Sequence, residues 1–314
     1  MPVSHRFDQF LAWVDCLDCA LPFQFGGATQ CGRLNSHNNN QDASALWSRS
    51  HCIVGVVCDG CSTSMGSFSN NEVGSRILSL LSAEITGRFS SEHGVGHLLQ
   101  FLPNMETAIC ERLLQVAEAV SPEGQRDLFL KSFFMSTMLV FAIDSQSFAV
   151  FGCGDGFYAI NGKIESLDDF EGTYLTGRLS GNKDWQSRIS SGDLGIRLHQ
   201  TGETSLLQSL LIGTDGFEEV PARFQSAFAA LTIPQAANTN KPGFWPAMAA
   251  EYRSRFWQTR EVREWADVQD SHDDRTFLLV RRLSPDRKEV SSPCSVSQET
   301  TSQSAADSSL PLAT

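Results

Sequence analysis

The sequence predicts an α+β domain in which helices pack on mainly antiparallel sheets. Two long helical segments, over 71–89 and 103–120, lie between short apolar runs that are typical of strands. Of the 314 residues, 41% are hydrophobic and 19% charged, a balance that indicates a globular chain and excludes full-length disorder or a fibre.

The first predicted strand is 51–58, an apolar, β-branched run that ends in Asp59-Gly60 and reads as a buried strand entering a turn. The helix over 71–89 is predicted from apolar residues that recur every four positions on one stripe. These residues are Val73, Ile77, Leu81, Ile85 and Phe89.

The helix over 103–120 carries an apolar inner face that comprises Met105, Ile109, Leu113, Val116 and Val120. Two strands follow, separated by three polar residues that suit a hairpin. The predicted strands after this helix are 137–143, 147–153, 157–160, 206–212 and 276–280, and further helices are predicted at 222–230 and 245–260.

The segment 165–202 is polar, rich in Gly and Ser, and weakly periodic. Long loops inside a globular domain are usually functional, so we interpret it as a candidate lid. The last thirty residues are rich in Ser, Thr, Gln and Ala and cannot bury enough apolar surface to fold. The predicted division is an N-terminal extension over 1–25, a catalytic domain over 26–283 and a disordered tail over 284–314.

The formal net charge of −12 disfavours nucleic acid and anionic lipid as partners, because the field of the whole chain repels them. The nine cysteines and the lack of an apolar leader favour free thiols in a cytoplasmic protein. The pairs Cys16/Cys19 and Cys58/Cys61 have the spacing of zinc ligands, but neither has an obvious second pair to close a site.

Aspartates recur where strands begin or end. Asp42 precedes the first predicted strand and Asp59 ends it. Asp155 joins two later strands, Asp215 ends the run over 206–212, and Asp273 opens the last strand. A single Asp-Gly is ordinary turn chemistry, which is the alternative reading for each position. As a set, carboxylates meeting at one sheet edge would repel one another, and divalent cations remove that repulsion. Oxygen ligands without a His or Cys cluster select Mg²⁺ or Mn²⁺.

The motifs occur in a fixed order along the chain: Asn40-Gln41-Asp42, Val57-Cys58-Asp59-Gly60, Ser136-Thr137, Gly154-Asp155-Gly156, Gly213-Thr214-Asp215-Gly216 and Asp273-Asp274-Arg275-Thr276. This series, over about 26–282, resembles the metal-dependent Ser/Thr protein phosphatases of type 2C, and most of all their bacterial branch. The resemblance implies a β-sandwich of two mainly antiparallel sheets, with helix pairs on both outer faces.

The resemblance also implies a role for each motif. Asp59 would bridge two ions of Mn²⁺ or Mg²⁺, with the backbone carbonyl of Gly60 as an added ligand. Asp42 would hold one of these ions, while Asp215 and Asp273 hold the other. Asp155 matches an aspartate that can bind a third, weaker ion.

Two positions depart from the family pattern. His37 stands where many members carry an arginine that grips the substrate phosphate, so we assign it the phosphate contact, with an idle loop histidine as the alternative. Arg33, nearby, could also fill that role. Cys61 stands where eukaryotic members often have a histidine proposed as general acid.

The predicted function is therefore a metal-dependent phosphoprotein phosphatase. Two close divalent ions would acidify a bridging water, and the resulting hydroxide would attack phosphorus directly. The expected partner is a protein phosphorylated on Ser or Thr by a kinase, and we expect a monomer. The alternatives are a catalytically weak sensing or binding module with the phosphatase fold and a small-molecule phosphohydrolase.

Overall fold

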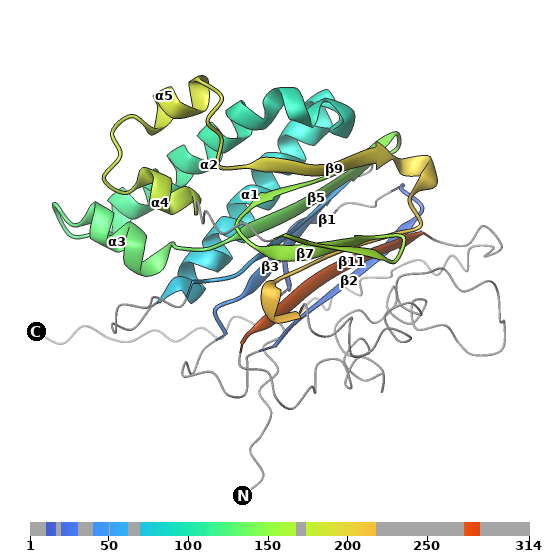
Figure 1. Ribbon diagram of the computed structural model, residues 1–314, viewed down its shortest axis with the longest axis horizontal. Coiled ribbons are helices and arrows are strands. Elements are labelled where there is room, and N and C mark those ends of the chain that lie inside the picture. The colour runs from blue at the N-terminus through green and yellow to red at the C-terminus, as the bar shows by residue number, and fades with distance from the viewer. Residues whose placement is uncertain are drawn as a thin grey trace, which may run out of the picture. The chain divides into compact units, whose positions relative to one another are not determined.

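The computed structural model describes residues 11–16, 20–30, 40–49, 51–61, 70–167, 174–217 and 273–282. These residues all belong to one unit, Met1–Leu283. They form two sheets and a layer of helices that covers one of the sheets (Figure 1). The predicted α+β class and the sandwich of two mainly antiparallel sheets are confirmed.

The six-stranded sheet has the order β1-β3-β4-β5-β6-β9. Every pair in it is antiparallel except β1 with β3, which is parallel. Its strands are β1 Leu11–Cys16, β3 Ala43–Arg49, β4 Cys52–Cys58, β5 Met138–Asp144, β6 Ser147–Cys153 and β9 Arg197–Glu203. The N-terminal strand β1 falls in the range predicted as an extension, yet it forms an edge of this sheet.

The five-stranded sheet has the order β2-β11-β10-β7-β8 and is antiparallel throughout. Its strands are β2 Phe23–Gln30, β7 Gly156–Ile160, β8 Lys163–Leu167, β10 Ser209–Gly213 and β11 Arg275–Arg282. The helices are α1 Asn71–His93, α2 Leu98–Val120, α3 Arg126–Phe133, α4 Leu175–Leu179 and α5 Trp185–Ser190, with short 3₁₀ turns η1 Val95–His97, η2 Thr204–Leu206 and η3 Asp215–Phe217.

Two apolar cores follow from the two-residue period of the central strands. On β4, Ile53 and Val57 point into the core between the two sheets, whereas Val54 and Val56 point into the core beneath α1 and α2. All four side chains are buried. Because β4 is covered on both faces, its sequence is a continuous apolar run.

Helix α1 lies where it is predicted, but the face it turns to the sheet is different. The predicted stripe packs beside the core, and Val73, its first residue, is 42% exposed. Apart from Leu78, the buried positions are small or polar, and they are Asn71, Gly74, Ser75, Ser79, Ser82, Ala83, Thr86, Gly87 and Ser90. Small side chains allow the helix axis to approach the sheet, and at Gly87 the Trp47 ring occupies the space that a Cβ would take.

The lid prediction for 165–202 is wrong for the part of it that the structure describes. Helices α4 and α5 lie in this segment, and β9 pairs with β6 at the edge of the six-stranded sheet. Leu175, Leu179, Trp185 and Ile189 are buried in the helix-side core. The helices have only five and six residues and β9 is an exposed edge strand, so neither generates a clear hydrophobic period.

Several predictions fall outside the described residues, among them the helices at 222–230 and 245–260 and the tail over 284–314. The three-part division of the chain therefore stays a prediction, as does a helix layer on the outer face of the five-stranded sheet. Within the described part, no helix is long and apolar enough to cross a membrane.

We expect Gly87→Ala to lower the free energy of unfolding, although alanine is the better helix former. An added Cβ would lie 2.2 Å from the Trp47 ring, and overpacking of about 1–3 kcal/mol outweighs a helix-propensity gain of up to about 1 kcal/mol. Urea denaturation would measure the change. Arg88→Ala, one position along and exposed, is the control, and equal stability of the two variants would contradict the close packing.

Candidate metal and phosphate site

The predicted carboxylates are brought together because strands of both sheets end in one region. In the six-stranded sheet, Ala43 pairs with Cys58, so Asp42 and Asp59 extend from adjacent strand ends. In the other sheet, Gly213 pairs with Phe157 on one side and with Phe277 on the other. Asp155, Asp215 and Asp273 therefore leave β7, β10 and β11 at the same end of three neighbouring strands.

The carboxylates of the two sheets interact electrostatically with one another. The pKa of Asp59 is raised well above its usual value, first by burial of its carboxyl group and then by the negative charges of Asp42, Asp215 and Asp273. The pKa of Asp215 is raised to about 6, first by burial and then by Asp273 and Asp155. All five predicted acidic residues thus belong to one electrostatic cluster, which we call the carboxylate cluster.

Asp42 is the most enclosed member of the carboxylate cluster, at 3% exposure. Burial, and next the charge of Asp274, raise its pKa. Its Oδ2 accepts a hydrogen bond from the Thr214 hydroxyl at 2.7 Å, whereas its buried Oδ1 accepts none from the residues that the structure describes. A buried carboxylate oxygen without a donor is costly, and a cation is the partner that would satisfy it.

The Asp59-Gly60 turn is fixed by hydrogen bonds to the start of β5. The carbonyl oxygen of Asp59 accepts from the Ser136 hydroxyl at 2.7 Å and from the backbone N–H of Thr137 at 2.9 Å. Gly60 forms an isolated bridge with Ser136, and a Cβ at Gly60 would lie 2.7 Å from the Gln41 carbonyl oxygen. Ser136-Thr137 therefore acts on this turn through the backbone, and glycine is required for the close approach.

Two residues of the motifs, Asp274 and Thr214, support the carboxylate cluster although no role is predicted for them from the sequence. Asp274 is buried, and its Oδ2 accepts the backbone N–H of Gln41 at 2.5 Å, which ties β11 to the segment before β3. The Thr214 hydroxyl, besides donating to Asp42, accepts the backbone N–H of Thr276 at 3.0 Å. The signal in the sequence that could have identified both residues is their position beside Asp273 and Asp215 in the motifs.

The donor set suits a hard divalent cation, because it consists of carboxylates with one oxygen unsatisfied. In the described part of the chain, no group of three or more His, Cys, Asp or Glu side chains is arranged as a ready-made metal site. The oxygen atoms of these carboxylates are therefore suitable ligands for a hard divalent ion. His37 and Arg33 lie outside the described residues, so the phosphate contact stays a prediction.

A sequence model of the family described as protein phosphatase 2C matches residues 30–251, more than half of the chain. The chain belongs to the protein phosphatase 2C family. The matched segment contains four acidic residues of the carboxylate cluster, and Asp273 follows it. The family predicted from the motif series is thereby confirmed.

Solved structures share the fold at low identity. A bacterial serine phosphatase carrying one substitution is 15% identical, with a TM-score of 0.51 over 84% of this chain and 99% of that one. A second variant is 14% identical, with a TM-score of 0.52 over 83% and 99%. The Ser/Thr phosphatase Stp1 from Staphylococcus aureus is 16% identical, with a TM-score of 0.50 over 88% and 100%. No match was found among curated protein sequences.

In this phosphatase family member, the raised carboxyl pKa values predict how stability depends on pH in the presence of a chelator. A group whose pKa is higher in the folded state retains its proton longer there, so stability falls as pH rises from the usual value to the raised one. For Asp215 this interval runs from 3.8 to about 6. Thermal melts in EDTA should therefore show a contribution to stability that is lost across this interval.

Asp215→Asn should flatten that pH dependence, because the substituted side chain has no proton to lose. Asp184→Asn, at an exposed position away from the carboxylate cluster, is the matched control and should retain the native slope. Identical slopes for native protein and Asp215→Asn would show that the carboxylates do not repel one another in the folded chain.

Proposed function

We propose that this chain is a metal-dependent phosphatase that removes phosphate from phosphoserine and phosphothreonine in proteins. The observation that carries the proposal is the meeting of five acidic residues, supplied by both sheets, in a member of the protein phosphatase 2C family. The proposed ligands of Mn²⁺ or Mg²⁺ are Asp42, Asp59, the carbonyl oxygen of Gly60, Asp155, Asp215 and Asp273.

When bound, such ions supply positive charge that lowers the pKa of water and neutralises the phosphoryl oxygens. The chain's own contribution is to position the ligands. The negative charges of both Asp42 and Asp215 act on Asp59, as they would on a carboxylate that serves two ions at once. Thr214 holds one oxygen of Asp42, which leaves the second oxygen for a cation.

A water-derived nucleophile also agrees with the state of the nearest buried thiol. Burial raises the pKa of Cys58 well above its usual value, and the charges of Cys153, Asp42 and Asp59 act in the same direction. A thiol that keeps its proton is a weak nucleophile, so Cys58 is not suited to forming a phosphocysteine. Direct attack by water at phosphorus is the reaction that the residues support.

Removal of metal should abolish hydrolysis of a phosphothreonine peptide, and Mn²⁺ should restore it, because the proposed ligands are oxygen atoms. The measurement is phosphate release after EDTA treatment and desalting, with and without added Mn²⁺ or Mg²⁺. Full activity in excess EDTA would overturn the metal-dependent reaction. Hydrolysis of small phosphate esters without hydrolysis of phosphopeptides would instead identify a small-molecule phosphohydrolase.

Asp59→Asn should lower kcat by about a hundredfold or more, since it removes the charge placed between the proposed ions. The fold should survive, because losing one carboxylate relieves repulsion among those that remain. Steady-state kinetics with Mn²⁺, paired with thermal melts, would measure both effects, and the exposed Asp184→Asn is the control. Near-native kcat in a folded Asp59→Asn protein would exclude the bridging role.

A further inference from the structure

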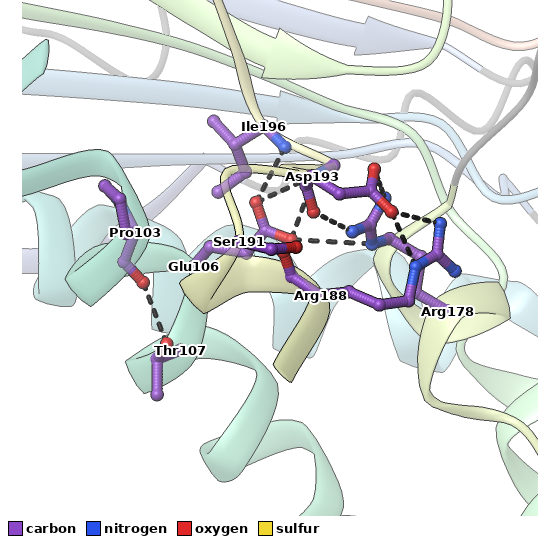
Figure 2. A network of polar contacts seen from close by, with 9 residues as sticks. Pro103, Glu106, Thr107, Arg178, Arg188, Ser191, Asp193 and Ile196 are labelled. Atoms are coloured by element: carbon purple, nitrogen blue, oxygen red, sulfur yellow. Dashed lines mark hydrogen bonds and ion pairs between the residues drawn. The ribbon is translucent and has the colours of Figure 1, made fainter. Parts of the chain in front are cut away.

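A second buried charge cluster lies on the helix side of the molecule, where α2 meets the segment between α4 and β9 (Figure 2). Its centre is Glu106 of α2, whose side chain is wholly buried. The Glu106 carboxylate accepts the backbone N–H of Gly195 at 2.8 and 2.9 Å and that of Ile196 at 2.9 Å. One helix side chain therefore holds the turn that leads into β9.

Arg178 of α4 is the cation that faces this carboxylate. Its side chain is only 5% exposed, with Nε 3.6 Å from Oε1 of Glu106 and Nη1 3.4 Å from Oδ1 of Asp193. Its Nη2 also donates to the Asp193 carbonyl oxygen. Figure 2 shows Arg188 reaching the same Asp193 carboxylate from the other side, but that contact is exposed to solvent.

The energetics of this pair suggest a positional role. Burying two charges costs about as much as their attraction returns, so such a pair adds little net stability. It does penalise every arrangement that separates the partners, because one charge is then left buried and alone. The Glu106–Arg178 pair thus selects one placement of α4 on α2, within a core whose other contacts are apolar and non-directional.

The start of α4 connects this pair to the carboxylate cluster. The Thr176 hydroxyl donates to the carbonyl oxygen of Phe134 at 2.7 Å, and the next carbonyl, that of Met135, accepts the backbone N–H of Cys61 at 2.9 Å. Cys61 follows the Asp59-Gly60 turn directly. Helix α4 and the Asp59 turn are therefore attached to the same short segment before β5.

Tyr174, immediately before α4, lies where these elements converge. Its side chain is half-buried, and the pKa of its phenol is raised first by burial and then by the neighbouring Cys61, Asp155 and Asp59. The carboxylate cluster consists of hydrogen-bond acceptors, whereas a tyrosine offers both a donor and a rigid apolar ring to a bound peptide. Tyrosines in such partly buried positions are frequent anchors of binding surfaces.

We propose that Glu106 and Arg178 are positioning residues that hold Tyr174 at the rim of the carboxylate cluster, where Tyr174 contacts the bound phosphoprotein. This inference rests on the proposed function and adds to it a peptide-binding wall built from α4. A small phosphate ester reaches the carboxylate cluster without touching this wall. The two kinds of substrate should therefore respond differently when the pair is disrupted.

The test compares a phosphothreonine peptide with p-nitrophenyl phosphate, in Mn²⁺, for Glu106→Gln, Arg178→Met and Tyr174→Ala. We expect the KM for the peptide to rise by about tenfold or more in each variant, because a displaced binding group loses its contact. In Glu106→Gln and Arg178→Met, the kcat and KM for the small ester should stay within about twofold of native. Glu106→Leu/Arg178→Met, which removes both charges, should recover thermal stability but not the peptide KM.

Two controls separate positioning from loss of stability. Leu113→Ala creates a cavity on the same helix, seven residues along from Glu106, and should lower the melting temperature without changing the ratio of peptide to ester kcat/KM. Arg188→Gln removes only the exposed contact to Asp193 and should also keep the native ratio. Equal losses for both substrates in the Glu106 and Arg178 variants, matching those of Leu113→Ala, would overturn the proposal.

Hydrogen exchange supplies a readout that does not depend on turnover. In Glu106→Leu/Arg178→Met, amide protection should fall over 174–180 and at Gly195 and Ile196, whose N–H groups Glu106 accepts. Unchanged protection there would overturn the positioning role. A native chain that hydrolyses neither substrate would refute the proposed function instead, and hydrolysis of both with unaltered peptide KM in Tyr174→Ala would refute the wall alone.

Discussion

The carboxylates at the shared strand ends repel one another, and the fold holds them together against that repulsion. Burial and neighbouring negative charge both oppose ionisation of Asp42, Asp59 and Asp215, so their convergence is unfavourable without positive charge nearby. A rigid frame is needed to hold them together. The frame is the pair of sheets, whose antiparallel registers end at the same level and whose shared apolar core fixes one sheet against the other.

Hydrogen bonds between distant segments fix the carboxylates that the strand ends bring together. Thr214 and Asp274 link the segments around β10, β11 and β3, and Ser136-Thr137 fastens the Asp59 turn to β5. These bonds join backbone or hydroxyl groups to residues distant in the chain, so each motif depends on another for its geometry. The presence of these motifs is thus explained physically, because every one of them supplies either a carboxylate or a group that fixes a carboxylate.

The elements predicted well are those with a strong local signal. The strand 52–58 and the hairpin of β5 and β6 could be predicted because buried strands are apolar and β-branched. Helix α1 could be predicted because its apolar residues recur at helical spacing over a long segment. The side of α1 that faces the sheet could not be predicted, because a small residue such as Gly87 is required there only by its contact with Trp47, forty positions away. The acidic residues could be predicted from their motifs, whereas Asp274 and Thr214 act through partners that only the fold reveals.

The molecule buries the carboxylates of Glu106 and Asp42 in opposite ways, and this difference indicates different roles for the two residues. Glu106 is matched within the chain, by a guanidinium and by backbone N–H groups that satisfy both of its oxygens, so it needs nothing from outside. Asp42 is left with an oxygen that no group in the described part of the chain satisfies. A matched charge fixes a position, while an unmatched one creates affinity for a cation. Helix α4 lies between these two environments and Tyr174 immediately precedes it, so the chain places the end of a fixed element beside the carboxylate cluster.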